Sequence, residues 1–287
     1  MLTAVFLAIV AALGWGASDF FGGDATGQDT PVFVVVAVAE LIGLGLLVPV
    51  LLVRGVAPPA DARLGLAAIA GVAVTCELSL IYVALSRGAA FITAPVGALG
   101  AAVAVSIGLI AGDPLGPALA VGLLFALLGG AISAWTSGEG GSGTSVAQTV
   151  AICLGAAAAV GTMLTCFHAA GRLDSVWVTA VEHASTGASA GVAALCAGPR
   201  PVRALLPPRR RLPGLGWIAV TGVGGDLAYA IASHHGALSV ISAISSLYPV
   251  TTVALGRVLH GRRATRVQLL GAALALLGAA LLGATAR

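Results

Sequence analysis

The sequence predicts an all-α integral membrane protein with ten transmembrane helices in two inverted five-helix repeats. Of its 287 residues, 59% are hydrophobic and only 9% are charged, whereas a soluble domain carries about 25% charged residues. Apolar runs of about 18 residues or more, long enough to cross a bilayer as helices, recur along the whole chain. The two halves also resemble each other. Because so few charged residues cannot cover a water-facing surface, the composition excludes a soluble protein.

The first half contains five predicted spans, separated by short segments rich in Gly, Pro or charged residues. They cover residues 2–21, 31–53, 63–86, 89–111 and 115–135. The polar stretch "TSGEGGSGTS" follows and has the composition of a flexible linker. We therefore divide the chain into a first repeat (1–136), a linker (137–145) and a second repeat (146–287).

The second half contains five further predicted spans. They cover residues 146–170, 176–197, 215–233, 238–258 and 267–284. "ALLGGA" at 126–131 recurs as "ALLGAA" at 275–280, and Glu77 falls opposite Asp226 at nearly the same offset. An odd number of spans per repeat turns the second copy upside down. Inverted repeats are the usual construction of secondary transporters, whose sites lie at the repeat interface.

Four carboxyl groups lie well inside predicted spans. They belong to Glu40, Glu77, Glu182 and Asp226. A charged side chain near the bilayer centre costs about 2.5–3.5 kcal/mol on insertion scales, so we expect these groups to face the bundle interior or a wet cavity. There a carboxyl group can carry a proton or attract a cationic solute. The alternative role is a structural hydrogen bond between helices.

Four aromatic residues within the spans are further candidates for the cavity wall, where a ring can stack on an organic cation. They are Trp15, Tyr82, Tyr229 and Tyr248. Ordinary packing is the alternative for each. Pro95 and Pro249 fall inside the fourth and ninth predicted helices, where proline is expected to kink the helix. The four cysteines lie in apolar segments without a CxxC motif, so no metal, cofactor or catalytic residue is predicted.

Several segments resemble the EamA branch of the drug/metabolite transporter superfamily. They are "WGASDFFGG", "LSRGAAFITAPVGALGAAVAVSIGLIAGDPLG" and "SLYPVTTVALGRVLHGRRATRVQLLGAALALLGAALL". The resemblance implies ten helices in two inverted repeats, with the first, third, fourth, sixth, eighth and ninth around a central cavity. It implies that the fifth and tenth lie outside. The family usually carries Gly-Glu after the fourth and ninth helices, where this chain has Gly112-Asp113 and Gly261-Arg262.

The expected function is secondary active transport of small organic metabolites or drugs by alternating access, coupled to protons as an exporter or exchanger. The expected partners are a small solute, protons and the lipid bilayer of a cell membrane, of the bacterial inner-membrane type, without nucleic acid. A monomer and a homodimer both remain open. The family pattern places both chain ends in the cytoplasm, but the Arg-rich loop at 197–214 favours the opposite orientation.

The sequence is less consistent with two other functions, an intramembrane protease and a non-transporting scaffold or sensor. An intramembrane aspartyl protease needs a GxGD motif and a second intramembrane Asp, but "VGGD" at 223–226 lacks the first Gly. The serine type needs a GxSG-like motif with a His partner, and neither "GASDF" nor "STGAS" supplies it. We therefore expect no enzyme. A non-transporting scaffold or sensor would have little use for repeated carboxylates in hydrocarbon.

Overall fold

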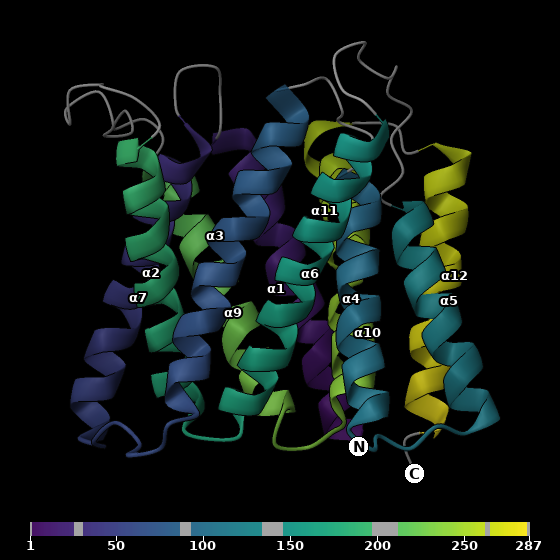
Figure 1. The fold of residues 1–287 in the computed structure, drawn as a ribbon, viewed down its shortest axis with the longest axis horizontal. Coiled ribbons are helices and arrows are strands. Elements are labelled where there is room, and N and C mark those ends of the chain that lie inside the picture. Colours follow the sequence, from purple (N-terminus) through teal and green to yellow (C-terminus); the bar gives the residue numbers. More distant parts are fainter. Residues whose placement is uncertain are drawn as a thin grey trace.

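The protein, seen in a computed structural model, is a helical bundle (Figure 1). The structure describes residues 2–25, 31–86, 93–133, 146–196, 212–261 and 265–285, and no strand occurs among them, which confirms the all-α class. The first half forms α1 (Leu2–Ala25), α2 (Val32–Arg54), α3 (Leu64–Ser86), α4 (Thr93–Ile110) and α5 (Pro117–Ser133). The second half forms α6 (Val146–Gly171), α7 (Ser175–Cys196), α9 (Leu212–Ala232), α10 (Leu238–Ser245), α11 (Tyr248–His260) and α12 (Arg266–Thr285). The linker at 137–145 and most of the Arg-rich loop lie outside the described residues.

Six helical segments of the described chain are long and apolar enough to cross a membrane. They are Leu2–Ala25, Val32–Arg54, Leu64–Ile81, Leu154–Gly171, Pro213–Ala232 and Leu238–His260. Three shorter apolar helices are Leu99–Ile110, Pro117–Ile132 and Arg266–Leu282. The predicted seventh span does form a helix, α7, but polar side chains such as Thr179, Glu182 and Thr186 are buried along it and make it less apolar. The protein is therefore an integral membrane protein, with α7 as its most polar predicted span.

The ninth predicted span is not one kinked helix but two helices. α10 ends at Ser245 and α11 begins at Tyr248, with Ser246 and Leu247 between them. Pro249 has no backbone N–H to donate to the preceding turn, and proline is well suited to the first turn of a helix. The expected kink at Pro249 is therefore a break. Pro95 lies in the first described turn of α4, and its side chain is outside the described part of the chain.

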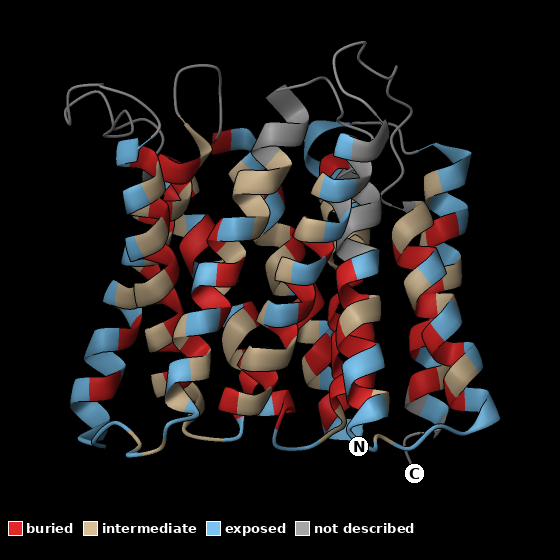
Figure 2. Ribbon diagram, in the orientation of Figure 1, coloured by how far each residue is buried: buried red, intermediate tan, exposed pale blue. Residues whose placement is uncertain are grey.

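Helices of the first half pack mainly against helices of the second half. α1 packs on α9, α3 on α6, α2 on α7, and α5 on α12, with the last pair at one edge of the bundle (Figure 1). Buried residues face the neighbouring helices, and exposed residues face outward (Figure 2). A Cβ at Gly14 would lie 2.7 Å from Cα of Gly225, so the backbones of α1 and α9 are in direct contact. Small residues at such crossings are typical of packed membrane helices.

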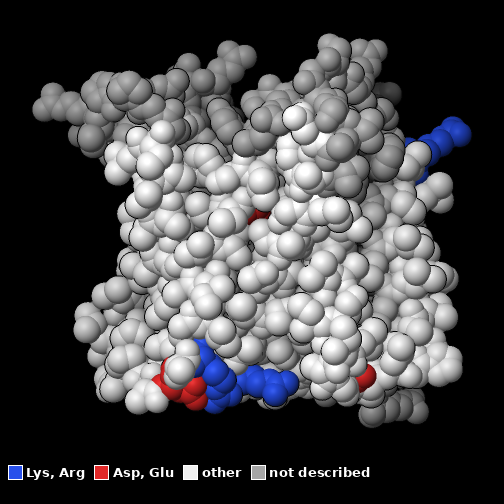
Figure 3. All heavy atoms as spheres, in the orientation of Figure 1, with Lys and Arg blue, Asp and Glu red and all other residues white. Residues whose placement is uncertain are grey.

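Both chain ends lie on the same side of the bundle, as an even number of spans predicts (Figure 1). On this side, Asp113 in the α4–α5 loop accepts a 2.8 Å hydrogen bond from the backbone N–H of Ser239 in α10. Asp113, which stands where the family usually has Glu, thus connects the first half of the chain to the second by this hydrogen bond. Charged side chains gather near the helix ends, whereas the broad middle of the face in Figure 3 is uncharged except for a recessed acidic patch.

Candidate functional site

A central cavity of about 360 Å³ lies between the two halves of the chain. Its wall includes residues of α1, α2 and α3 from the first half and of α6, α7, α9 and α11 from the second. No described residue of α5 or α12 lines it, in agreement with the expectation for the fifth and tenth helices. α2 and α7, which the family resemblance left out, do contribute to the wall. Both halves of the chain are therefore needed to enclose the cavity.

Five carboxyl groups line this cavity, and no Lys or Arg of the described chain does so. They belong to Asp19, Glu40, Glu77, Glu182 and Asp226. The four acids singled out from the sequence thus meet in one space, although each lies on a different helix. Asp19, placed here by the structure, lies one helical turn beyond Trp15 on the same face of α1. All five acids border the cavity.

The cavity reaches from the middle of the bundle toward the side away from the chain ends. Its lining residues on α1 run from Trp15 to Gly23, and those on α2 run from Val32 to Glu40. These segments are the end of α1 and the start of α2, which face away from the N- and C-termini (Figure 1). The described lining includes no residue from the first half of α1 or the second half of α2. On α1 and α2, the cavity is therefore lined only by the helix halves that lie away from the chain ends.

The imidazole of His183 lies between two of the carboxyl groups. Its Nδ1 forms an ion-pair contact with Glu40 Oε2, and its Nε2 lies 3.2 Å from Asp226 Oδ2. The side chain of His183 is only 1% exposed. A His with a carboxylate at each nitrogen is suited to the doubly protonated form, in which both nitrogens donate. His183 therefore connects α2, α7 and α9 at the base of the cavity.

Glu182 and His183 are neighbours in the chain, yet both reach the same cluster. Oε1 of Glu182 accepts a 2.6 Å hydrogen bond from Thr186 Oγ1, one turn further along α7. Its Oε2 is buried and has no hydrogen-bond partner in the described part of the molecule. Consecutive residues on a helix point about 100° apart, so sequence spacing predicts divergence. Both side chains nevertheless reach the cluster because α7 is packed on several sides, by α2, α3 and α9. The polar residues along α7 were the signal in the sequence that this helix is buried in the bundle.

Trp15 places its indole against Asp226. Nε1 of Trp15 donates a 2.8 Å hydrogen bond to Asp226 Oδ1, so this carboxylate is held by α1 as well as by His183. A Cβ at Gly225 would lie 2.6 Å from Trp15 Cδ1. The absence of a side chain at Gly225 therefore makes room for the Trp15 indole next to the Asp226 carboxylate.

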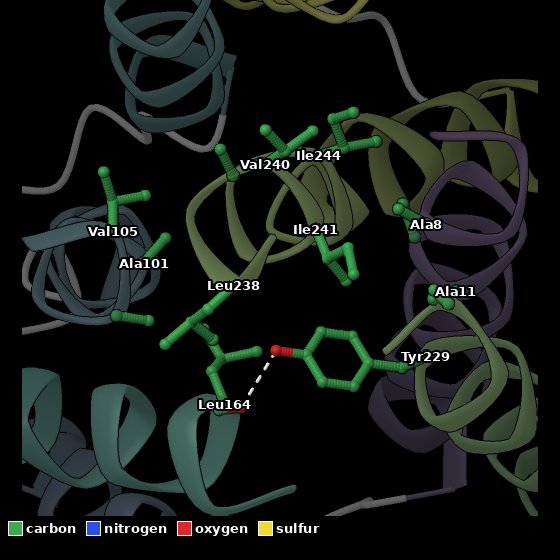
Figure 4. Packing of buried hydrophobic residues seen from close by; sticks show 14 of the residues in the cluster. Ala8, Ala11, Ala101, Val105, Leu164, Tyr229, Leu238, Val240, Ile241 and Ile244 are labelled. Atoms are coloured by element: carbon green, nitrogen blue, oxygen red, sulfur yellow. Dashed lines mark hydrogen bonds between the residues drawn. The ribbon is translucent and has the colours of Figure 1, made fainter. Parts of the chain in front are cut away.

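The three candidate tyrosines have different positions. Tyr248 lines the cavity, together with Phe167. Tyr229 lies behind the wall and is fully buried; its hydroxyl donates a 2.9 Å hydrogen bond to the Leu164 carbonyl and lies 3.0 Å from Ser242 Oγ (Figure 4). Its ring stacks on Phe167 at 5.8 Å and packs against Trp15 at 5.3 Å. Tyr229 thus supports the aromatic wall from behind. The side chain of Tyr82 is not among those described.

The site can act on cations. Five carboxyl groups beside a single imidazole attract positive charge. Aromatic rings can stack on an organic cation, and a carboxyl group facing a wet cavity can exchange protons. The fold and this cavity define a helical membrane protein with an acidic central site shared between its two halves.

Comparisons with known proteins agree with this class. Residues 147–284, in the second half of the chain, match the model of the EamA-like transporter family. The family is one of membrane transporters of the drug/metabolite type. No curated protein matches the chain. Among the solved structures 28 chains match, and one, described as "Crystal structure of protein", has a TM-score of 0.80 over 99% of this chain and 97% of its own at 21% identity. That likeness shows the fold.

Proposed function

We propose that the protein is a secondary active transporter that moves a small organic solute, cationic or zwitterionic, across a cell membrane by alternating access in exchange for protons. The observation that carries this proposal is the cavity itself. Five carboxyl groups from both halves of the chain line it, without Lys or Arg in its described wall. Trp15, Phe167 and Tyr248 add aromatic surface for the organic part of the solute.

The pattern of helix packing supports two structural repeats. We pair α1 with α6, α2 with α7, α3 with α9, α4 with α10 and α11, and α5 with α12. The packing of α1 on α9 then corresponds to that of α6 on α3, and the packing of α1 on α10 and α11 corresponds to that of α6 on α4. The contacts of α2 with α7 and of α5 with α12 map onto themselves. A two-fold relation between the halves produces such a pattern, and rocking one half against the other would alternate access to the central site.

The position of the cavity supports the same mechanism. On α1 and α2 it is lined only by the helix halves away from the chain ends, and Tyr229 packs behind the wall residue Leu164 (Figure 4). A transporter of this kind must have a second state, open to the other side, and a bound solute shifts the populations of the two states by its different affinity for them.

The carboxyl groups support the proposed exchange with protons. A proton and a solute cation both bind a carboxylate, and they exclude each other from it. Glu77 and Asp226, which line the cavity from opposite halves, are the pair that we propose for this exchange. Release of a proton would then accompany binding of the cation.

The test is a flux assay in proteoliposomes. A panel of radiolabelled amines and amino acids is screened with and without a pH gradient, and a proton indicator is enclosed in the vesicles. We expect flux of at least one cationic solute that responds to the gradient, and loss of this response in the double variant Glu77→Gln plus Asp226→Asn. Asp61→Asn is the matched control, because it also removes a carboxylate but in a loop, where Asp61 pairs with Arg63 at 2.7 Å.

Two results would overturn parts of the proposal. An unchanged response in the double variant would exclude Glu77 and Asp226 from proton exchange. If solutes of the panel raise the unfolding temperature of the purified protein but are never transported, the protein is a membrane sensor or scaffold, since binding alone stabilises a fold.

A further inference from the structure

We propose that Glu40, Glu182 and His183 form a binding site for one divalent metal ion of the zinc type, at the wall of the central cavity. This inference goes beyond the transport of an organic solute, and it is tested without any flux measurement. It rests on three features of the cluster: the convergence of the ligand atoms, the uncompensated buried charge, and the support behind the histidine.

The ligand atoms converge from two helices. One carboxylate oxygen of Glu40 on α2, one of Glu182 on α7 and a ring nitrogen of His183 all lie within 4.8 Å of one another. Donor atoms bound to one tetrahedral zinc ion at about 2.0–2.2 Å lie about 3.4 Å apart. Side-chain movements of about 1 Å would close the site on an ion. Three protein ligands leave the fourth position of zinc for water or a solute.

The carboxyl groups of the cluster outnumber its single imidazole. Three carboxyl groups, those of Glu40, Glu182 and Asp226, surround one imidazole, and no Lys or Arg lines the adjoining cavity among the described residues. Glu182 is 5% exposed, and its Oε2 is buried without a hydrogen-bond partner among the groups described. Buried charges in proteins are paired or coordinate metals. A divalent cation would satisfy the free oxygen and offset the charge of the carboxylates.

The histidine is supported as a metal ligand. Nδ1 faces the Glu40 carboxylate, and Nε2 faces Asp226 at 3.2 Å. Metal-binding histidines usually donate their other ring N–H to such a carboxylate, which fixes the ring orientation. Asp226 is itself held by Trp15. A Cβ at Gly43 would lie 3.0 Å from both Nδ1 and Cε1 of His183, so the ring is also packed closely against α2.

The cavity gives the ion a route to the site. Glu40 and Glu182 both line it, so an ion in the cavity meets two of its ligands directly. An imidazole among the ligands favours zinc, copper, iron or nickel over magnesium or calcium, which prefer oxygen donors alone.

The experiment measures zinc binding to the purified full-length protein in detergent. The protein first carries His234→Gln and His235→Gln, because these adjacent exposed histidines could bind zinc at the surface. After treatment with a chelator, zinc is titrated by calorimetry and counted by elemental analysis. We expect one zinc ion per chain. Glu182→Gln should weaken binding about tenfold or more, and Asp226→Asn about 10–100-fold, as for other groups that orient a metal-bound histidine.

Glu77→Gln is the matched control. It removes a carboxylate of the same cavity that is not part of the cluster, and the zinc affinity should stay within twofold. X-ray absorption of the zinc-loaded protein should show one imidazole and oxygen donors, and this readout needs no variant that might fail to fold. No stoichiometric zinc, or zinc bound equally by Glu182→Gln, would overturn the proposal and leave the cluster as carboxyl groups that share protons with His183.

Discussion

The indole Nε1 of Trp15 and the carboxylate of Asp226 are joined by a hydrogen bond of 2.8 Å across 211 residues of chain. Trp15 lies on α1 and Asp226 on α9, so this bond connects the two halves of the protein at the cavity wall. The other oxygen of the same carboxylate lies 3.2 Å from His183 Nε2. The position of Asp226 therefore depends on groups from both halves.

Trp15→Phe should remove the hydrogen bond and keep an aromatic ring. A hydrogen bond to a charged group contributes about 1.5–3 kcal/mol, so we expect solute transport to fall about tenfold or more while the helical content stays unchanged. Transport and circular dichroism are the measurements. Trp177→Phe is the control: its Nε1 donates a 2.9 Å bond to the Val56 carbonyl outside the central cavity. Equal losses in the two variants would contradict a special role of Trp15.

Gly225→Ala should destabilise the protein more than Gly224→Ala. The new Cβ at 225 would meet Trp15 Cδ1 at 2.6 Å, whereas a Cβ at 224 meets nothing within 4 Å. Overpacking costs about 1–3 kcal/mol, and Ala for Gly in an open helix position adds up to about 1 kcal/mol of stability. Unfolding of both variants in detergent measures the difference. A smaller effect at 225 than at 224 would be evidence against the close crossing of α1 and α9.

Tyr229→Phe should lower stability with little effect on solute affinity. The change leaves Ser242 without its bond to the Tyr229 hydroxyl inside the packed wall, at a cost of about 1–3 kcal/mol. Tyr248→Leu, which changes a residue of the cavity surface, should instead raise the half-saturation concentration for solute. Flux at varied solute concentration, together with thermal unfolding, separates the two roles. The reverse pattern would show that Tyr229 contacts the solute.

Arg54→Gln should reduce stability more at neutral pH than at low pH. Arg54 pairs with Asp174 at 2.5 Å, and this side-chain hydrogen bond lowers the pKa of Asp174 below its ordinary value. The pair therefore stabilises the fold above the unfolded pKa of about 3.9, and this stability is lost as the pH falls through the lower folded value.

Both side chains of this pair are partly exposed, at 35% and 19%, so the loss of stability at neutral pH should be small. Unfolding of the wild type and Arg54→Gln is compared at pH 7 and pH 3. Asp174 still accepts hydrogen bonds of 3.1 Å from the N–H groups of Val176 and Trp177 at the start of α7 in this variant, so only the ion pair changes. A difference as large at pH 3 as at pH 7 would contradict the assignment.

The helices and their order could be predicted because hydropathy is a local property. Runs such as 31–53 reveal a span from their own composition, and α2 covers Val32–Arg54. The break before Tyr248 was underestimated, since proline inside an apolar run predicts a kink or a break equally well. The importance of His183 was missed, because its contacts with Glu40 and Asp226 depend on how three helices are rotated about their axes.

The sequence by itself determined that this protein is a helical membrane bundle and that acids lie within its apolar segments, because the length and hydropathy of a segment are set by neighbouring residues. The tertiary structure alone decided that these acids line one cavity, that Asp19 and His183 belong to their surroundings, and that Tyr229 stands behind the wall. The physical reason is that the rotation and spacing of helices are set by contacts between distant segments, such as the backbone crossing of Gly14 and Gly225. No local pattern records such contacts.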